Sequence, residues 1–285
     1  MDPTAFLLPC GKRLHLQHGP IDLIIGADGD QHAAFKAATA RFQTILVDLV
    51  AELPELRLPL TQDIPAPFGS TARRMDQAAR PFMQTAYVTR MAAVAGCVAD
   101  TVLDVMKEQD ITRGYVNNGG DIALHLTPDT SFTMAMAASH GQELGRIKID
   151  YTDPIRGIAT SGRHGRSHSL GIADSVTVLA QNAGAADVAA TLIANAVDLP
   201  NHPAVIRTPA FALDDTSDLG SLPVVTAVGK LAPVDVTYAL ETGLKRANSF
   251  ITRNLISGAA IFLQDRSETT CPAQLSITQR TPHHA

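Results

Sequence analysis

The stretch that most constrains the fold of this chain runs from Arg156 to Val197. It predicts a small-residue turn, a basic loop, a strand, and then a helix of alanines and branched aliphatic residues. The helix carries one carboxylate, Asp187, and one hydroxyl, Thr191. The helix therefore suits a cation. The loop suits an anion, because it gathers four basic or titratable side chains: Arg163, His164, Arg166 and His168.

The elements around this stretch follow one another without a regular alternation. Two strands are expected on either side of a Gly19-Pro20 turn, and two more on either side of a turn from Asn117 to Asp121. The chain lacks the strand-helix repeat and the G-x-G-x-x-G motif of a dinucleotide fold. We therefore predict an α+β fold in which mixed or antiparallel sheets pack against helices. The expected helices cover 31–53, 91–106 and 234–247, and the expected strands lie at 111–116, 122–126, 133–137, 145–150, 204–206, 224–228 and 257–263.

Length and charge limit the domain count and the class of ligand. A chain of 285 residues with 45% hydrophobic residues is long enough to bury a large core without staples. We expect a single domain over residues 1–285, with a loosely ordered tail from Asp265. The formal charge of −5, without a long basic run, argues against nucleic acid as a partner. A small molecule is the expected ligand.

The cysteines and the N-terminal segment indicate a compartment. Cys10, Cys97 and Cys271 are odd in number and far apart, so they suggest neither a disulfide framework nor a C-x-x-C metal site. Residues 1–10 have no basic region ahead of their few apolar residues, which argues against an export signal. No apolar run approaches the about 20 residues that a membrane span requires. We expect a cytoplasmic protein without a membrane partner, and the sequence leaves its oligomeric state open.

Two arginines occupy an unusual place. Gly69, Ser70 and Thr71 are plausible helix caps, so Arg73 and Arg74 fall in the first turn of a helix. Cations there are disfavoured by about 0.3–1 kcal/mol because the exposed amides carry positive potential. A phosphate would relieve that repulsion. The alternative is that both arginines face solvent or pair with Asp63 or Asp76.

Two glycine positions have both a structural and a functional interpretation. Gly96 lies inside the 91–106 helix, where it costs about 1 kcal/mol relative to alanine. It therefore indicates crowding by a packed neighbour or by a ligand. The sequence N-N-G-G-D at 117–121 is explained by a hairpin turn that needs positive φ, without any ligand.

Asp187 and Thr191 are four residues apart on the predicted helix, so their side chains share one face. Oxygen ligands of this kind suit Mg²⁺, which typically takes one or two carboxylates and completes its shell with waters and phosphate oxygens. The alternative is that Asp187 satisfies the helix dipole while Thr191 bonds back to the carbonyl of Asp187.

His168 is the candidate proton acceptor. An unperturbed imidazole titrates near neutrality, and the donors around it could orient a substrate. A plain surface histidine is the alternative. The basic loop lies between T-S-G and a polar helix face, an arrangement that favours a phosphorylated ligand bound with a metal.

Five motifs and one histidine occur in register between Thr89 and Val197. They are M-A-A-V-A-G at 91–96, V-N-N-G-G-D at 116–121, A-T-S-G at 159–162, His168, S-V-T-V at 175–178 and A-D-V-A-A-T at 186–191. In order and spacing this set resembles the ApbE-like proteins, whose best-understood members are Mg-dependent FAD:protein FMN transferases. The resemblance implies a T-fold-like α+β fold.

The resemblance also implies roles for individual residues. Asp187 and Thr191 fall on the metal-ligand positions, and His168 falls on the histidine proposed to assist the transfer. Apart from the resemblance, Arg73 at the predicted helix start and Arg163 in the basic loop are predicted to contact the cofactor. The implied cofactors are FAD or FMN and Mg²⁺, with a protein acceptor as a possible partner. The residues placed at the flavin nucleotide are Asn118, Gly119, Gly120, Asp121, Thr160, Ser161 and Gly162.

The chain departs from the family pattern at several points. Ala95 replaces a lysine, Arg163 replaces an acid, and the segment after His168 is shortened to S-L-G-I-A-D. With these changes the chain resembles the uncharacterised, short-looped cytoplasmic branch of the superfamily. Three hypotheses follow: an enzyme that cleaves FAD or transfers its FMN part, a non-catalytic carrier of a flavin or nucleotide, and an enzyme acting on another ring-phosphate compound such as a pterin.

Overall fold

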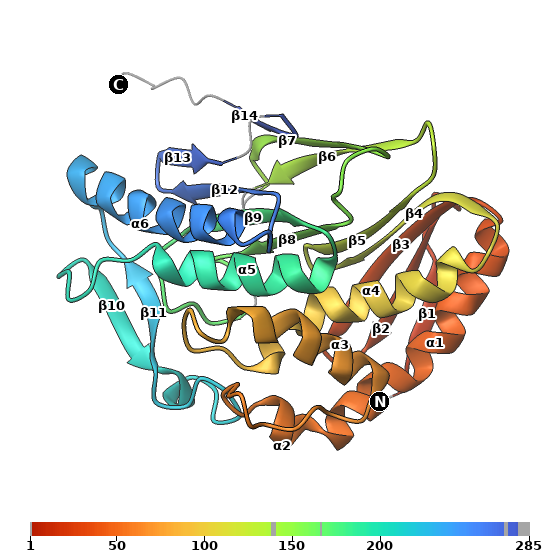
Figure 1. The fold of residues 1–285 in the computed structure, drawn as a ribbon, viewed down its shortest axis with the longest axis horizontal. Coiled ribbons are helices and arrows are strands. Elements are labelled where there is room, and N and C mark those ends of the chain that lie inside the picture. Colours follow the sequence, from red (N-terminus) through yellow and green to blue (C-terminus); the bar gives the residue numbers. More distant parts are fainter. Residues whose placement is uncertain (1, 138–140, 166, 271–272, 279–285) are drawn as a thin grey trace. The chain divides into compact units, whose positions relative to one another are not determined.

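The computed structural model describes residues 2–137, 141–165, 167–270 and 273–278 (Figure 1). The chain forms two compact units. The first unit contains residues 1–130, 154–159 and 179–189, and the second contains residues 131–153, 160–178 and 190–285. Helix α5 (Ala183–Ala196) contributes its first half to the first unit and its second half to the second. The prediction of one domain over the whole chain stays a prediction.

The first unit is built on an antiparallel sheet. Its strands follow one another in space in the order β1, β2, β3, β4, β5, and β8 pairs antiparallel with β5 through Ile122 and Ile158. The alternation of buried and exposed residues along β2 and β3 explains why these segments form strands with one face in the core. The bounds are Thr4–Leu7 for β1, Arg13–His18 for β2, Ile21–Gly29 for β3, Ile111–Asn118 for β4, Asp121–Leu126 for β5 and Gly157–Ser161 for β8.

Two long helices pack against this sheet and against each other: α1 (Gln31–Ala51) and α4 (Val94–Lys107) (Figure 1). Asp30 begins α1 by accepting the Ala33 N–H with its side chain at 3.0 Å. The apolar face of α1 buries Phe35, Phe42 and Ile45, at the helical spacing that the sequence shows. Both predicted helices and both predicted hairpins of this unit are confirmed.

Shorter helices complete the first unit. The 3₁₀ turn η2 (Arg90–Ala93) precedes α4, so α4 itself begins three residues later than the periodicity predicts. The proline-rich segment between α1 and α4 includes α2 (Leu53–Leu56), α3 (Ser70–Ala79) and the 3₁₀ turn η1 (Arg80–Phe82).

The second unit contains a three-stranded sheet in the order β14, β7, β6, a two-stranded sheet of β10 and β11, and strands β9, β12 and β13 side by side. Helix α6 (Pro233–Thr252) packs on β12 and β13. The short turn η3 (Ala210–Ala212) lies between β10 and β11. The strand bounds are Ser131–Ala137 for β6, Glu143–Asp150 for β7, Ser175–Ala180 for β9, Val205–Pro209 for β10, Pro223–Val228 for β11, Gly258–Leu263 for β12, Arg266–Thr269 for β13 and Leu275–Ile277 for β14.

The α+β prediction is confirmed, with two differences in detail. Where a small-residue turn is predicted ahead of the basic loop, the chain forms strand β8. A Cβ on Gly157 would lie 2.0 Å from the carbonyl carbon of Asn182, so the small residue there reflects close packing of the backbone and not a turn. Strands β13 and β14 lie in the stretch that was expected to be loosely ordered, and Leu275 of β14 is buried beside β7.

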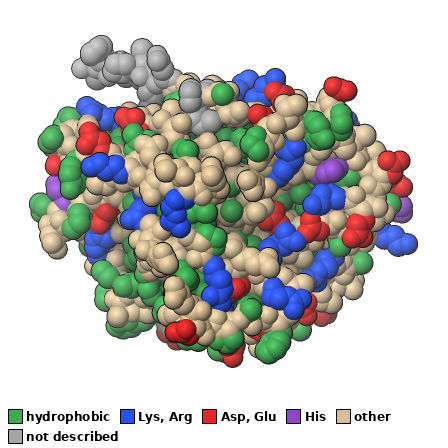
Figure 2. All heavy atoms as spheres, viewed as in Figure 1, with side chains coloured by type: hydrophobic (Ala, Val, Ile, Leu, Met, Phe, Trp, Pro, Cys, Tyr) green, Lys and Arg blue, Asp and Glu red, His purple; other side chains and the backbone are tan. Residues whose placement is uncertain are grey.

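Figure 2 shows one face of the molecule, on which acidic and basic side chains are interspersed. None of the helices in the described parts of the chain combines the length and the apolar character needed to cross a membrane.

Candidate functional site

The start of α4 lies directly against the start of α5 in the first unit. A Cβ on Gly96, the third residue of α4, would lie 2.2 Å from the carbonyl oxygen of Ala183. A Cβ on Gly184 would lie 2.5 Å from Sγ of Cys97. Of the two causes of crowding that the sequence left open at Gly96, the packed neighbour is the one found.

Each of these two helices places a carboxylate on the first turn of the other. The Gly96 N–H donates to Oδ2 of Asp187 at 3.0 Å. The Ala183 and Gly184 N–H groups donate to Oδ1 and Oδ2 of Asp100, at 3.2 and 3.0 Å. Because the first N–H groups of a helix have no partner inside it, these carboxylates satisfy donors that would otherwise be orphaned. Asp187 therefore caps α4, and not its own helix as the structural alternative supposed.

The β4–β5 turn is joined to the same place. Gly119 and Gly120 have φ of 66° and 114°, a backbone that the two glycines adopt at low cost. The Asn118 amide donates from Nδ2 to the carbonyl oxygen of Ala95 at 3.1 Å. Asn118 is only 3% exposed, and its Oδ1 atom is buried without a hydrogen-bond partner. A buried acceptor without a partner is costly, so this atom indicates a place for a donor from outside the chain.

The carboxylates near this turn repel one another. Burial raises the pKa of Asp187 well above its usual range, the Asp121 carboxylate raises it further, and the Ala95 and Gly96 N–H groups oppose the shift. Burial also raises the pKa of Asp100, against the stabilising effect of the Gly184 and Ala183 N–H groups. Acids with raised pKa values in one cluster are typical of a functional site, and a cation would relieve their repulsion.

The donors at this cluster fit a hard cation that brings ligands of its own. Asp121 and Asp187 supply carboxylate oxygens. Within the ranges that the structure describes, no three His, Cys, Asp or Glu side chains gather into a cage for a metal. This donor set agrees with Mg²⁺, which keeps several waters and phosphate oxygens in its shell. Thr191 lies on α5 one turn after Asp187, on the same face by helix geometry.

The predicted site residues between Thr160 and His168 belong to the second unit. Thr160 and Ser161 end β8, and Oγ1 of Thr160 lies 3.1 Å from Oγ1 of Thr177. Gly162 has φ of 148°, and a Cβ on it would lie 2.6 Å from the carbonyl oxygen of Asp174. Only glycine fits this turn between β8 and the basic loop.

The basic loop is partly neutralised from within. Nη2 of Arg163 lies 2.6 Å from Oδ1 of Asp174, and its Nε donates to the same oxygen at 2.8 Å. Nε2 of His164 is 3.4 Å from that oxygen. Arg166, which the sequence analysis counted in this loop, lies outside the described residues. His168 is exposed.

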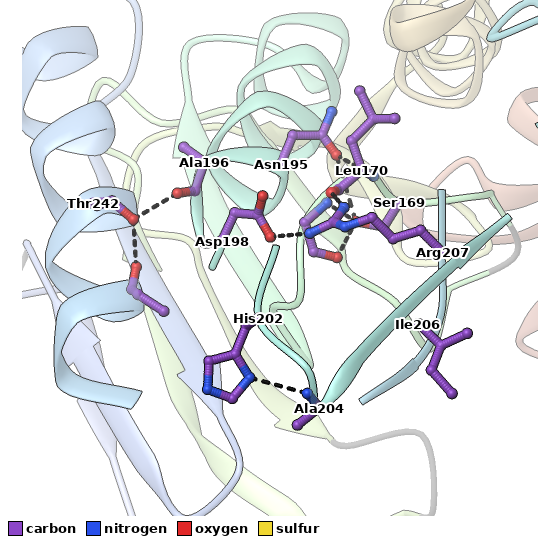
Figure 3. Close-up of polar contacts among 12 residues, drawn as sticks. Ser169, Leu170, Asn195, Ala196, Asp198, His202, Ala204, Ile206, Arg207 and Thr242 are labelled. Atoms are coloured by element: carbon purple, nitrogen blue, oxygen red, sulfur yellow. Dashed lines mark hydrogen bonds and ion pairs between the residues drawn. The ribbon is translucent and has the colours of Figure 1, made fainter. Parts of the chain in front are cut away.

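Residues that the sequence analysis did not select hold the end of this loop (Figure 3). Oδ1 of Asn195 accepts the Leu170 N–H at 2.9 Å, and Nη1 of Arg207 donates to the Leu170 carbonyl oxygen at 2.5 Å. Arg207 also pairs with Asp198. These partners are 25 and 37 residues from Leu170 in the chain, so no local pattern announces them.

The two arginines of α3 differ in their surroundings. Arg73 is exposed, whereas Arg74 pairs with Asp104 of α4 and not with Asp63 or Asp76. Asp76 instead holds two other arginines, Arg80 at 2.6 Å and the buried Arg90 at 2.7 Å.

A family model described as AbpE bacteria matches residues 5–269. The chain belongs to this family. The ApbE-like assignment made from the motifs is thereby confirmed.

Relatives include UPF0280 proteins of methanogens. The protein from Methanopyrus kandleri is 32% identical over 209 residues, which cover 72% of this chain and 82% of the relative. A protein from Methanococcus maripaludis is 40% identical over 110 residues, which cover 37% of this chain and 44% of the relative.

Two solved structures were also matched. One is the flavin transferase ApbE from Vibrio cholerae, with a TM-score of 0.48 at 12% identity, covering 96% of this chain and 98% of that one. The other is the apo form of the Pseudomonas stutzeri flavinyl transferase ApbE, with a TM-score of 0.49 at 13% identity, covering 95% of each chain.

The structure shows the contacts of two residues that depart from the family motifs, Ala95 and Arg163. Ala95, in place of the lysine, contributes its carbonyl oxygen to Asn118 and an N–H group near Asp187. Arg163, in place of the acid, is paired with Asp174. In this member of the AbpE family the first change therefore leaves a backbone contact in the site, and the second brings its own counter-ion.

Proposed function

We propose that this chain is a Mg²⁺-dependent flavin-binding enzyme that cleaves FAD at its pyrophosphate and releases or transfers the FMN part. One observation carries the proposal: Asn118 and Asp187 both bond to the first turn of α4, the Asp121 carboxylate raises the pKa of Asp187, and the buried Oδ1 atom of Asn118 has no hydrogen-bond partner. The choice of a flavin as the ligand rests on membership of the AbpE family and on the motifs in register.

Residues of the β4–β5 turn and of α5 bind and orient the ligand. Asp187 and Asp121 would hold Mg²⁺, and Thr191 adds a hydroxyl from the next turn of α5. A bound Mg²⁺ supplies charge neutralisation on the pyrophosphate oxygens. The Oδ1 atom of Asn118 accepts a hydrogen bond from an N–H group of the ligand, which satisfies an atom that is otherwise orphaned. The two-glycine turn lets the backbone approach the ligand closely.

The chemical step is a displacement at phosphorus. An acceptor oxygen, from water or from a protein hydroxyl, forms a bond to the phosphorus of the FMN half. The bond from that phosphorus to the bridging oxygen breaks, and AMP leaves with the electron pair. The proton of the acceptor passes to a base, for which His168 is the predicted residue. We assign Thr160, Ser161 and Gly162 to the nucleotide as further predictions from the A-T-S-G motif. Arg73, from its place in the first turn of a helix, and Arg163, from the basic loop, are predicted to contact it as well.

A flavin carrier without turnover is the second candidate. The replacement of the family lysine by Ala95 favours it, because a side-chain charge in the motif is lost. The pairing of Arg163 with Asp174 favours it as well, since that cation is already matched within the chain. In a carrier, FAD binding survives removal of the Asp187 carboxylate.

The products decide between the two candidates. The purified protein is incubated with FAD and MgCl₂, with and without a candidate acceptor protein, and AMP is measured by chromatography and covalent flavin by in-gel fluorescence. EDTA and Asp187→Asn serve as controls. The enzyme releases AMP in the wild type alone and only with Mg²⁺. Absence of both AMP and covalent flavin removes the enzyme proposal, and tight FAD binding that persists in Asp187→Ala then identifies a carrier. Binding of a pterin with refusal of FAD overturns both.

A further inference from the structure

Asp100 is a buried acid with no role in the motifs. It lies on α4 one turn after Gly96 and is only 7% exposed. Both of its carboxylate oxygens accept backbone N–H groups of α5, from Ala183 at 3.2 Å and from Gly184 at 3.0 Å. Burying an acid is expensive unless its oxygens are hydrogen-bonded, so these two contacts explain how the carboxylate is accommodated.

The first turn of α5 depends on this acid. Asn182 accepts the Ala185 N–H with its side chain at 2.8 Å and the Ala186 N–H with its carbonyl oxygen at 3.2 Å. The two remaining N–H groups of the turn are those that Asp100 accepts. The first turn of α5 contains no acid of its own. Asp100 therefore completes the set of acceptors that this helix start requires.

The clamp between α4 and α5 is reciprocal and tight. Asp100 of α4 holds the start of α5, while Asp187 of α5 accepts the N–H of Gly96 at 3.0 Å. Neither Gly96 nor Gly184 leaves room for a Cβ, since one meets the Ala183 carbonyl and the other meets Cys97. The start of α5 is thus fixed from two sides, one turn before Asp187.

We propose that Asp100 is a positioning residue for the cation site: it fixes the first turn of α5 so that the Asp187 carboxylate is held beside Asp121. This inference rests on the proposed role of Asp187 as a metal ligand. It requires a carboxylate in particular. Asparagine has one acceptor oxygen and one NH₂ donor, so it would direct a donor at the N–H of either Ala183 or Gly184.

The test measures metal binding directly, with Mn²⁺ as the probe and electron paramagnetic resonance as the readout. Asp100→Asn is compared with the wild type and with Asp104→Asn. Asp104 is a matched control because it lies on the same helix, one turn further on, where it pairs with Arg74 and Lys107 at a more exposed position. Outer-shell residues typically change metal affinity 10- to 100-fold. We expect Asp100→Asn to weaken Mn²⁺ binding by about 10-fold or more, and Asp104→Asn to leave it unchanged.

A second pair of variants moves the start of α5 without removing a carboxylate. Gly184→Ala places a methyl group against Sγ of Cys97, so it should weaken Mn²⁺ binding as Asp100→Asn does. Adding Cys97→Ala removes that sulfur, and the double variant should regain affinity. Circular dichroism confirms that each variant is folded, and if Asp100→Asn does not fold, the Gly184 pair alone decides.

The possible failures are distinct. If the wild type binds no Mn²⁺, or if Asp187→Asn binds it as well as the wild type does, the metal site of the proposed function is wrong. If the wild type binds Mn²⁺, Asp187→Asn does not, and folded Asp100→Asn and Gly184→Ala both bind it normally, the positioning role of Asp100 is overturned while the metal site stands.

Discussion

Asn118 shows how a single residue can serve both the fold and a ligand. Its Nδ2 bonds to the Ala95 carbonyl oxygen and ties the β4–β5 turn to α4, while its buried Oδ1 has no partner. A fold selected for stability alone would not retain an orphaned acceptor in the core. The residue is better explained as half of a contact that a ligand completes.

Replacing this amide should separate the two roles. Asn118→Ala loses the bond to Ala95, which lowers the free energy of unfolding by about 1 kcal/mol. It also removes the acceptor offered to the ligand, so FAD affinity should fall about 10-fold, corresponding to about 1.4 kcal/mol. Flavin fluorescence titration measures the affinity, and urea denaturation measures the stability. Asn248→Ala, at an exposed position of α6, is the control. Unchanged FAD affinity in a folded Asn118→Ala protein would contradict the role.

Asp187 should make the metal-free protein less stable than it need be. Its pKa is raised in the folded state by burial and by Asp121, so above the ordinary aspartate pKa of about 4 the folded protein binds more protons than the unfolded chain. The contribution of this group to the free energy of unfolding therefore decreases as the pH rises from about 4 toward the pKa of the folded state.

The variant Asp187→Asn removes this pH-dependent contribution to the free energy of unfolding. Without metal at neutral pH we expect it to unfold at a higher temperature than the wild type, and to show a smaller loss of stability between pH 4 and pH 7. Added Mg²⁺ should stabilise the wild type and leave the variant unchanged, because only a ligand of the folded state raises stability. Differential scanning calorimetry across that pH range provides the measurement. A variant less stable than the metal-free wild type at neutral pH contradicts the account.

At the scale of elements, the crossing of α4 and α5 places the acids. Gly96 and Gly184 bring the two helix starts into backbone contact, and each helix then reaches the other with one carboxylate. Close approach of this kind needs residues without a Cβ.

Gly96→Ala tests that contact. In a helix interior alanine is better than glycine by about 1 kcal/mol, but here its Cβ would lie 2.2 Å from the Ala183 carbonyl oxygen. Overpacking of this severity typically costs about 1–3 kcal/mol, so we expect a net decrease in the free energy of unfolding. Urea denaturation at fixed pH measures it. Equal or greater stability would mean that the helices do not meet at this glycine.

A second element, the end of the basic loop, is held by side chains of the second unit. Arg207 donates to the Leu170 carbonyl oxygen and pairs with Asp198 (Figure 3). Arg207→Ala should increase amide exchange at 169–171 by about 10-fold, because the anchor on Leu170 is lost. Hydrogen-exchange mass spectrometry measures this, with Arg253→Ala on the exposed end of α6 as control. Equal exchange in the wild type and in Arg207→Ala would show that the anchor is unimportant.

At the scale of the whole molecule, the sequence predicts local structure well and long-range contacts poorly. Hydrophobic spacing predicts α1, α4 and α6, and turn residues predict the β2–β3 and β4–β5 hairpins, because these signals come from neighbours in the chain. The sequence predicts a turn where strand β8 runs, because Gly157 owes its small size to close packing against Asn182, more than 20 positions away.

The same difference between local signals and long-range contacts applies to the candidate site. The motifs identify Asn118, Asp121 and Asp187, but not the way in which they meet. Asp100 was missed because its partners, Ala183 and Gly184, are 83 and 84 residues away. For the same reason the sequence offers Arg74 only solvent, a phosphate, Asp63 or Asp76, whereas the fold pairs it with Asp104.

The central claim is that this chain binds FAD together with Mg²⁺ through the Asp187 carboxylate. Isothermal titration calorimetry of FAD into the protein, in MgCl₂ and in EDTA, tests it most directly when wild type and Asp187→Asn are measured side by side. We expect FAD to bind the wild type at least about 10-fold more tightly with Mg²⁺, a difference of about 1.4 kcal/mol, and we expect Mg²⁺ to have no effect on FAD binding by the variant. Equal FAD affinity with and without Mg²⁺ in the wild type, or an undiminished Mg²⁺ effect in Asp187→Asn, would contradict it.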